Sequence, residues 1–247
     1  MKKLILLACA AVLSITMQAQ QIMVVKTKDN TQNEFIVSSI RKVRFRSSDE
    51  NPADPTANLF CPDERHPHLI DLGLPSGTRW ACCNVGATTP EDYGGYYAWG
   101  ETVAKLYYDW DSYSYYDVVT EQCADIGNDI ASTDYDVASA KWNNLWRMPS
   151  AEMFQELIDN CTWTWISQND ADGYLVTGVN GGAIFLPAAG GRVYEDIVLD
   201  GIEGDYWAST LYPEMENSAS CVMFRSSFYV LQSAQFFIGF SVRPVSK

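Results

Sequence analysis

The chain has 247 residues, a formal net charge of −14 at pH 7 and an apolar fraction of 47%. Such an acidic protein repels polyanions, which argues against nucleic acid and anionic membrane surfaces as partners. The length accommodates one large domain and a small appendage, and a domain of that size can bury a core without disulfide staples.

Residues 1–19 have the anatomy of a cleavable secretory signal. Lys2 and Lys3 form a positive n-region, Leu4 to Ile15 is almost unbroken apolar sequence, and Ala19 is a small residue at which signal peptidase would cut. The apolar stretch is shorter than the ~20 residues that a membrane-spanning helix needs, and no second stretch of that length follows. We therefore predict an exported protein that does not span the membrane and is secreted, periplasmic or held at the cell surface.

The mature chain is predicted to consist of an appendage, a linker and a main domain. Residues 20–46 form a β-rich, hairpin-like appendage, because Ile22 to Lys28 and Glu34 to Phe45 carry strand-like apolar patterns on either side of a polar turn. Residues 47–66 have the polar composition of a linker, rich in Ser, Asp, Glu, Asn and Pro. The main domain therefore occupies residues 67–247.

Two helices are predicted within the main domain. The shorter one runs from Asp134 or Asp136 to Lys141. The clearer one runs from an N-cap at Ser150 to Asn160, and four of its apolar residues fall on one helical face: Met153, Phe154, Leu157 and Ile158.

Strand and turn signals outnumber the helix signals. Tyr174 to Thr177 and Ala183 to Leu186 flank Asn180-Gly181, a pair that tolerates positive φ and favours a hairpin. Three closing strands are predicted at Ser220 to Phe224, Ser227 to Leu231 and Phe236 to Val242. These signals together predict a mixed α+β domain with many short strands.

The cysteines leave two alternatives open. Cys9 would leave with the signal, and the six that remain are an even number in a compartment where disulfides persist: Cys61, Cys82, Cys83, Cys123, Cys161 and Cys221. Alternatively these are buried free thiols, since Cys82 and Cys83 are adjacent and no C-x-x-C occurs. The signal also has an alternative cleavage site. Leu6-Leu7-Ala8-Cys9 spells a lipoprotein-type box, but cleavage and lipidation at Cys9 would leave a very short signal.

The sequence predicts no catalytic residues, no metal site and no cofactor. The chain has only two histidines, His66 and His68, so a base for a Ser or Cys nucleophile is hard to find and a metal site there is incomplete. The segment from Asp170 to Gly173 resembles the start of a calcium loop but lacks the downstream Glu. Asp109 and Asp111 do not make an arguable glycosidase pair.

Several blocks are too particular for composition to explain: Asp71 to Gly77, Trp80-Ala81, Gly95 to Glu101, Trp146 to Pro149, Tyr206 to Thr210 and Gly239 to Val245. Over residues 69–247 these blocks resemble the Fibrobacter succinogenes major paralogous domain (FISUMP) family of secreted and surface proteins of gut Bacteroidetes. The family usually has Glu where this chain has Met153, and Tyr-Trp-Ser where it has Ala208 as the third residue.

The resemblance implies the formylglycine-generating-enzyme branch of the C-type-lectin-like fold, with two helices, a twisted antiparallel sheet and long loops. The enzyme of that branch needs a pair of thiols, whereas Cys221 has no near companion in the late sequence. The tripeptides of calcium-dependent sugar binding, Glu-Pro-Asn and Gln-Pro-Asp, do not occur. Late strands and loops form the ligand face of hypervariable proteins in the same branch.

The tryptophans and arginines of these blocks are predicted to be framework. Each Trp buries about 150–250 Å² and seeks a partner for its indole N–H; the five concerned are Trp80, Trp99, Trp142, Trp146 and Trp207. Arg147 and Arg243 are expected to satisfy buried carbonyls or carboxylates such as Glu101.

With no catalytic, metal or cofactor site predicted, the sequence points to a binding surface. Tyrosine and phenylalanine offer large contact area at small entropic cost, and they cluster in two segments, so the predicted ligand-binding residues are Tyr113, Tyr115, Tyr116, Ser226, Phe228, Tyr229, Gln232, Phe236 and Phe237. We predict a non-enzymatic binding or adhesion module for an extracellular protein or glycan. The alternatives are a self-assembling surface or fimbria-associated subunit and a formylglycine-generating-type oxidase.

Overall fold

The computed structural model describes residues 22–26, 32–36, 69–142 and 145–246. The chain separates into two compact units, residues 1–51 and 52–247. In the first, strand β1 (Ile22–Lys26) pairs antiparallel with β2 (Gln32–Ile36), with Ile22 opposite Ile36. The predicted signal and linker lie outside the described residues.

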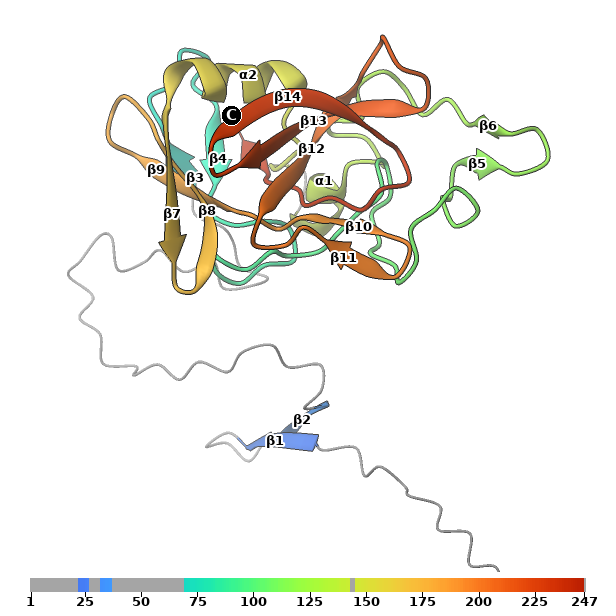
Figure 1. Cartoon of the computed structure of the whole chain (residues 1–247), viewed down its shortest axis with the longest axis horizontal. Coiled ribbons are helices and arrows are strands. Elements are labelled where there is room, and N and C mark those ends of the chain that lie inside the picture. The colour runs from blue at the N-terminus through green and yellow to red at the C-terminus, as the bar shows by residue number, and fades with distance from the viewer. Residues whose placement is uncertain (1–21, 27–31, 37–68, 143–144, 247) are drawn as a thin grey trace, which may run out of the picture. The chain divides into compact units, whose positions relative to one another are not determined.

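The second unit is a mixed α+β domain of mostly antiparallel strands, with two helices in the part that the structure describes (Figure 1). Helix α1 spans Val137–Trp142 and helix α2 spans Ala151–Asn160, so both predicted helices are confirmed. The Ser150 side chain caps α2 by accepting a hydrogen bond from the Met153 N–H at 3.4 Å. Asp136 caps α1 and accepts from the Ala138 N–H at 2.8 Å. Each cap satisfies donors that a helix start leaves open.

A late sheet and α2 form one half of the core. The sheet has the order β12-β13-β14, with β12 at Glu203–Leu211, β13 at Ser218–Arg225 and β14 at Phe228–Gln235. Helix α2 packs against all three strands (Figure 1). Phe154 and Leu157 of the helix are fully buried in one cluster with Tyr206, Val222 and Phe224 of the sheet.

The other strands form smaller sheets. One has the order β7-β8-β9, with bounds Thr162–Gln168, Ala171–Thr177 and Ala183–Pro187. Another has the order β15-β4-β3, with bounds Val245–Ser246, Arg79–Ala81 and Leu69–Asp71, so the end of the domain pairs beside its beginning. Two pairs complete the set: β5 (Tyr116–Asp117) with β6 (Gln122–Cys123), and β10 (Gly191–Val193) with β11 (Asp196–Val198). The β5–β6 pair projects from the body in Figure 1.

The predicted β8–β9 hairpin is confirmed, with Thr177 opposite Ala183. Its loop requires glycine because it approaches the backbone near β3. A Cβ on Gly178 would lie 2.0 Å from the Leu72 carbonyl oxygen, and one on Gly182 would lie 2.1 Å from that of Asp71.

The predicted closing strand from Phe236 to Val242 is wrong. This segment makes single bridges to successive partners: Gly239 to Arg192, Phe240 to Tyr97, and Ser241 to Tyr206. Because the partner changes from residue to residue, no continuous ladder forms, although the segment is buried as a strand would be. The other two closing strands are confirmed as β13 and β14.

Arg243 joins three separate parts of the domain. Its side chain is fully buried and donates to Asn84 Oδ1 at 2.8 Å, to the Ala81 carbonyl at 3.0 Å and to the Phe185 carbonyl at 2.8 Å. The expectation that Arg243 satisfies buried carbonyls is confirmed. Glu101 plays a different part from the one predicted, since it accepts from Lys105 Nζ at 2.9 Å and from Ser114.

Three of the five predicted framework tryptophans, Trp80, Trp99 and Trp207, are at most 1% exposed. The indole of Trp99 donates to the Ala208 carbonyl at 3.0 Å, and that of Trp207 donates to the Tyr97 carbonyl at 2.8 Å. In the described part of the chain the indole nitrogen of Trp80 has no hydrogen-bond partner. These rings are framework, as their sequence context indicated.

Candidate functional site

The structure separates the predicted ligand-binding residues into two groups. The first group surrounds Trp99 and Trp110, on the side where β5 begins: Tyr113, Tyr115, Tyr116, Phe236 and Phe237. Phe236 stacks on Trp99 with ring centroids 4.8 Å apart, and Phe237 meets Trp110 edge-on at 4.8 Å. The tyrosine segment and the last aromatic segment are therefore neighbours in space.

Two of the five residues in this first group are buried and support the surface from beneath. Tyr113 is 3% exposed and Phe236 is 7% exposed. The Tyr113 hydroxyl donates to the Trp99 carbonyl at 2.8 Å, and the Tyr115 hydroxyl donates to the Gly100 carbonyl at 3.2 Å. Burial raises the pKa of Tyr113, so this phenol stays protonated. Tyr115, Tyr116 and Phe237 are half-buried. A ligand would reach them more readily than Tyr113 and Phe236.

The second group lies at the opposite end of the late sheet. Ser226 is in the β13–β14 turn, and Phe228 is 43% exposed on β14. Tyr229 points to the other face and stacks on Trp163 at 4.6 Å. Gln232 is opposite Cys221 and shares the face of Phe228, because side chains alternate along a strand.

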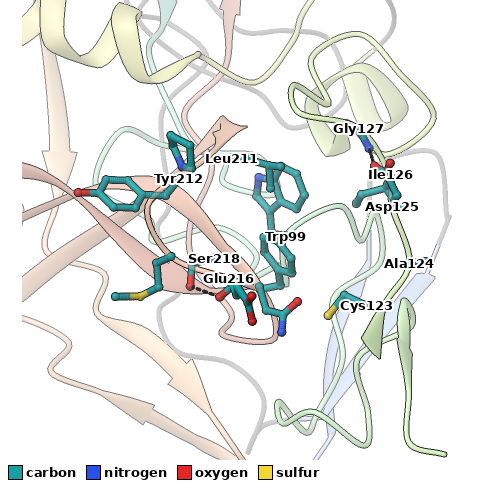
Figure 2. A pocket seen from close by; sticks show the side chains of 14 residues that line it. Trp99, Cys123, Ala124, Asp125, Ile126, Gly127, Leu211, Tyr212, Glu216 and Ser218 are labelled. Atoms are coloured by element: carbon teal, nitrogen blue, oxygen red, sulfur yellow. Dashed lines mark hydrogen bonds between the residues drawn. The ribbon is translucent and has the colours of Figure 1, made fainter. Parts of the chain in front are cut away.

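A pocket of about 280 Å³ lies beside the first group. Its walls come from residues 123–127, which run from the end of β6, and from residues 211–218, which run from the end of β12 to the start of β13. Trp99 and Phe236 line it between these two segments. Figure 2 shows the two walls on opposite sides of Trp99. The pocket thus combines an aromatic floor with walls from irregular chain segments.

Backbone hydrogen bonds hold both walls to the scaffold. The Leu211 N–H donates to the Asn128 carbonyl at 2.9 Å, and the Phe236 N–H donates to the Asn217 carbonyl at 3.0 Å. Asn217 has φ of 53°, a left-handed conformation that Asn accepts more readily than most residues. Asp125 Oδ1 accepts from the Gly127 N–H at 3.0 Å and closes a local turn. The pocket is therefore formed before any ligand arrives.

The chemistry of the pocket suits binding. Asp125 and Glu216 are exposed and give the walls negative charge, while the exposed thioether of Met215 adds an adaptable apolar contact. Cys123 is half-buried, and burial raises the pKa of its thiol, which keeps it protonated at neutral pH. A protonated thiol is a weak nucleophile.

Sequence reasoning predicted Phe236 but missed the pocket walls. Leu211, Tyr212, Met215 and Glu216 lie in a connection with an ordinary turn composition, and no pattern shows that this connection will stand opposite residues 123–127. Their juxtaposition arises from long-range packing.

A buried acidic pair lies elsewhere on the late sheet. Glu203 and Asp205 occupy the same face of β12, and Arg225 Nε lies 2.5 Å from Glu203 Oε2. Burial, followed by the charge of Glu203 and a hydrogen bond with it, raises the pKa of Asp205 to about 8. Asp205 is thus protonated at neutral pH and donates to its neighbour. Burial, and then the charges of Asp205 and Glu203, raise the pKa of the Cys221 thiol well above its usual value.

The structure also shows the state of the residues that the sequence offered for calcium binding and thiol chemistry, as far as they lie in the described ranges. Asn169 and Asp170 both have positive φ and form the two-residue turn between β7 and β8, so this segment is a hairpin turn. Cys82 is disulfide-bonded, whereas Cys83, Cys123, Cys161 and Cys221 are free thiols. His66 and His68 lie outside the described residues. Within the described ranges, no group of three or more His, Cys, Asp or Glu side chains is arranged to hold a metal ion.

In the part of the chain that the structure describes, no helix has the length and apolar character needed to cross a membrane. Comparison with protein-family models finds no match, and neither the curated proteins nor the solved structures yield a similar chain.

Proposed function

We propose that this protein is an exported, non-enzymatic binding or adhesion module that recognises a protein or glycan through loops and late strands. The observation that carries the proposal is the preformed pocket between residues 123–127 and 211–218, which has Trp99 and Phe236 as its floor. Concave sites with apolar lining and a few polar groups are the usual form of ligand sites.

We also propose that the domain has the C-type-lectin-like fold of the FISUMP family. Two features support this reading: the two helices with mostly antiparallel strands, and the pairing of β15 with β4, which joins the end of the domain to its start. The residues that carry the resemblance serve the scaffold, since Trp80, Trp99, Trp207 and Arg243 are all buried.

The state of the thiols favours binding over oxidase chemistry. Cys221 is fully buried, and its raised pKa keeps it protonated. Burial likewise raises the pKa of Cys161 to about 11 and that of Cys83 to about 12. Thiol oxidation needs an accessible thiolate.

An array of glycans and surface proteins tests the proposal. The exported chain should retain specific ligands, and Ala124→Trp should abolish that binding because Ala124 lines the pocket and a large side chain would fill it. The matched control is Ala140→Trp, at an exposed position on α1. Retention of the same ligands by Ala124→Trp would contradict a role for the pocket.

One observation favours the self-assembling subunit as a second candidate. Among the described strands β14 is at a sheet edge, and it exposes Phe228 by 43% and Val230 by 41% on one face. A long apolar edge strand is a template for pairing with another chain. Light scattering should then show association that increases with concentration and is lost in Val230→Lys; a monomer at all concentrations would exclude this alternative.

A further inference from the structure

Two tyrosines form an exposed aromatic surface that lies outside the pocket. Tyr107 is 45% exposed and Tyr194 is 53% exposed. Their ring centroids are 5.7 Å apart, and the ring planes make an angle of 52°. Leu106, next to Tyr107, is 80% exposed. Exposed large apolar side chains gathered in this way mark interaction sites.

The scaffold fixes this tyrosine pair in place. Tyr194 lies at the β10–β11 turn with φ of 54°, an uncommon conformation for a bulky side chain. Its backbone exchanges two hydrogen bonds with Tyr108, at 3.0 and 2.8 Å. Tyr108 is fully buried, and its hydroxyl donates to the Tyr96 carbonyl at 2.6 Å. Strained residues that a rigid neighbour holds in place are concentrated at functional sites.

Acidic residues lie next to both tyrosines in the chain, since Asp109 is two residues after Tyr107 and Glu195 directly follows Tyr194. Partial desolvation, followed by the charges of Asp109 and Glu195, raises the pKa of Tyr107, and Asp111 adds a smaller effect. These three acids therefore lie close enough to Tyr107 for their charges to act on it.

The two nearby cations are already engaged. Lys105 Nζ lies 2.9 Å from Glu101 Oε1 and 2.7 Å from the Ser112 carbonyl. The Arg192 guanidinium donates to the Lys105 and Glu195 carbonyls at 3.3 and 3.4 Å. Lys105 is neutralised by Glu101, and the three carboxylates outnumber the one remaining cation, Arg192, so the tyrosine pair stands in an acidic setting on a protein whose net charge is −14.

We infer that the Tyr107–Tyr194 surface binds an arginine- or lysine-bearing segment of a partner protein. A cation placed over a tyrosine ring is attracted by the ring quadrupole, and flanking carboxylates add charge-assisted hydrogen bonds. A neutral glycan would gain stacking and hydrogen bonds from its hydroxyls to the carboxylates, but only a cationic side chain also gains charge attraction, which is why charge complementarity favours the basic segment. The inference is independent of the pocket and stands even if the pocket binds nothing.

Fluorescence anisotropy with a labelled arginine-containing peptide tests this inference on the full exported chain. The peptide should bind, and a peptide of the same sequence with citrulline in place of arginine should not. Tyr194→Asn, which suits the left-handed conformation, and Tyr107→Ser should each weaken binding about tenfold. Glu195→Gln should weaken it about fivefold.

Two variants serve as matched controls. Glu152→Gln makes the same charge change at an exposed position on α2, and Val179→Ser removes a 77% exposed apolar side chain from the β8–β9 loop; neither should alter binding of the peptide. If Glu152→Gln weakened peptide binding as much as Glu195→Gln, the effect of Glu195 would come from the net charge of the protein alone, which would overturn the inference. Equal binding of the citrulline peptide, or binding of neutral oligosaccharides that is lost in Tyr194→Asn, would overturn it as well.

Discussion

The region around Arg243 and the pocket beside Trp99 show how this domain divides its tasks. Every nitrogen of the Arg243 side chain donates to a protein oxygen at 2.8 to 3.0 Å, two in the segment from Ala81 to Asn84 and one at Phe185, so the hydrogen bonds of this region are satisfied within the fold. The pocket has equally firm anchors but leaves exposed carboxylates at Asp125 and Glu216. Under the proposed function, residues such as Arg243 contribute stability and the exposed side chains of the pocket walls contribute recognition, so a substitution in the walls should affect ligand binding more than folding.

Arg243→Ala should have the largest effect. It leaves the Asn84 side chain and two buried carbonyls without their donor, at about 1–3 kcal/mol for each unsatisfied group. We expect the described domain to lose its cooperative unfolding transition in urea. Arg79→Ala is the control, because that side chain is exposed on β4 and its loss should cost about 0.5 kcal/mol or less. Similar unfolding curves for the two variants would show that the buried contacts of Arg243 contribute no more stability than an exposed arginine does.

Asp205→Asn should change the pH dependence of stability. Folded Asp205 holds its proton up to about pH 8, whereas an ordinary Asp loses it near pH 4, so the folded state binds the extra proton between these values. The stability of the native chain should therefore decrease as pH rises from 4 to 8, by up to about 1.4 kcal/mol per pH unit, and then level off.

The asparagine variant should lack this decrease, since its amide does not titrate. Urea titrations of both proteins at several pH values across that range provide the measurement. A difference between the two that stays constant with pH would show that Asp205 titrates normally.

Tyr113→Phe should have a moderate effect. The hydroxyl donates to the Trp99 carbonyl at 2.8 Å inside the core, and its removal leaves that oxygen without this donor while the ring remains. We expect a loss of about 1–2 kcal/mol in the free energy of unfolding. Tyr107→Phe, on an exposed ring, is the control and should be neutral. A stable Tyr113→Phe protein would mean that this aromatic cluster is looser than its contacts indicate.

Phe228→Ser should have the smallest effect on stability. The side chain is 43% exposed near the end of an edge strand, so the expected change is within about 0.5 kcal/mol. Thermal unfolding monitored by circular dichroism provides the measurement. A large drop in the melting temperature would place Phe228 with the framework residues.

The sequence predicted those parts of the fold that depend on local chemistry. Ser150 is an N-cap and Asn180-Gly181 a hairpin turn because neighbouring residues decide those conformations. The segment from Phe236 to Val242 was misjudged because its apolar pattern reports burial, whereas strand formation also needs one continuous partner.

The candidate site was predictable only in part. Phe236 was found as an aromatic residue, but its position under the pocket depends on how residues 123–127 meet residues 211–218, which are far apart in sequence. Tyr194 was missed since a single tyrosine in a short turn carries no pattern. Contacts between distant segments, rather than local preferences, build both surfaces.

Hydrogen–deuterium exchange of the protein, with and without a ligand retained on the array, would show whether the pocket is the binding surface. We expect slower exchange in residues 123–127 and 211–218 and unchanged exchange around Arg243 and in the β13–β14 turn. Protection confined to the β13–β14 turn, or a change that spreads through the segments bonded to Arg243, would contradict this expectation.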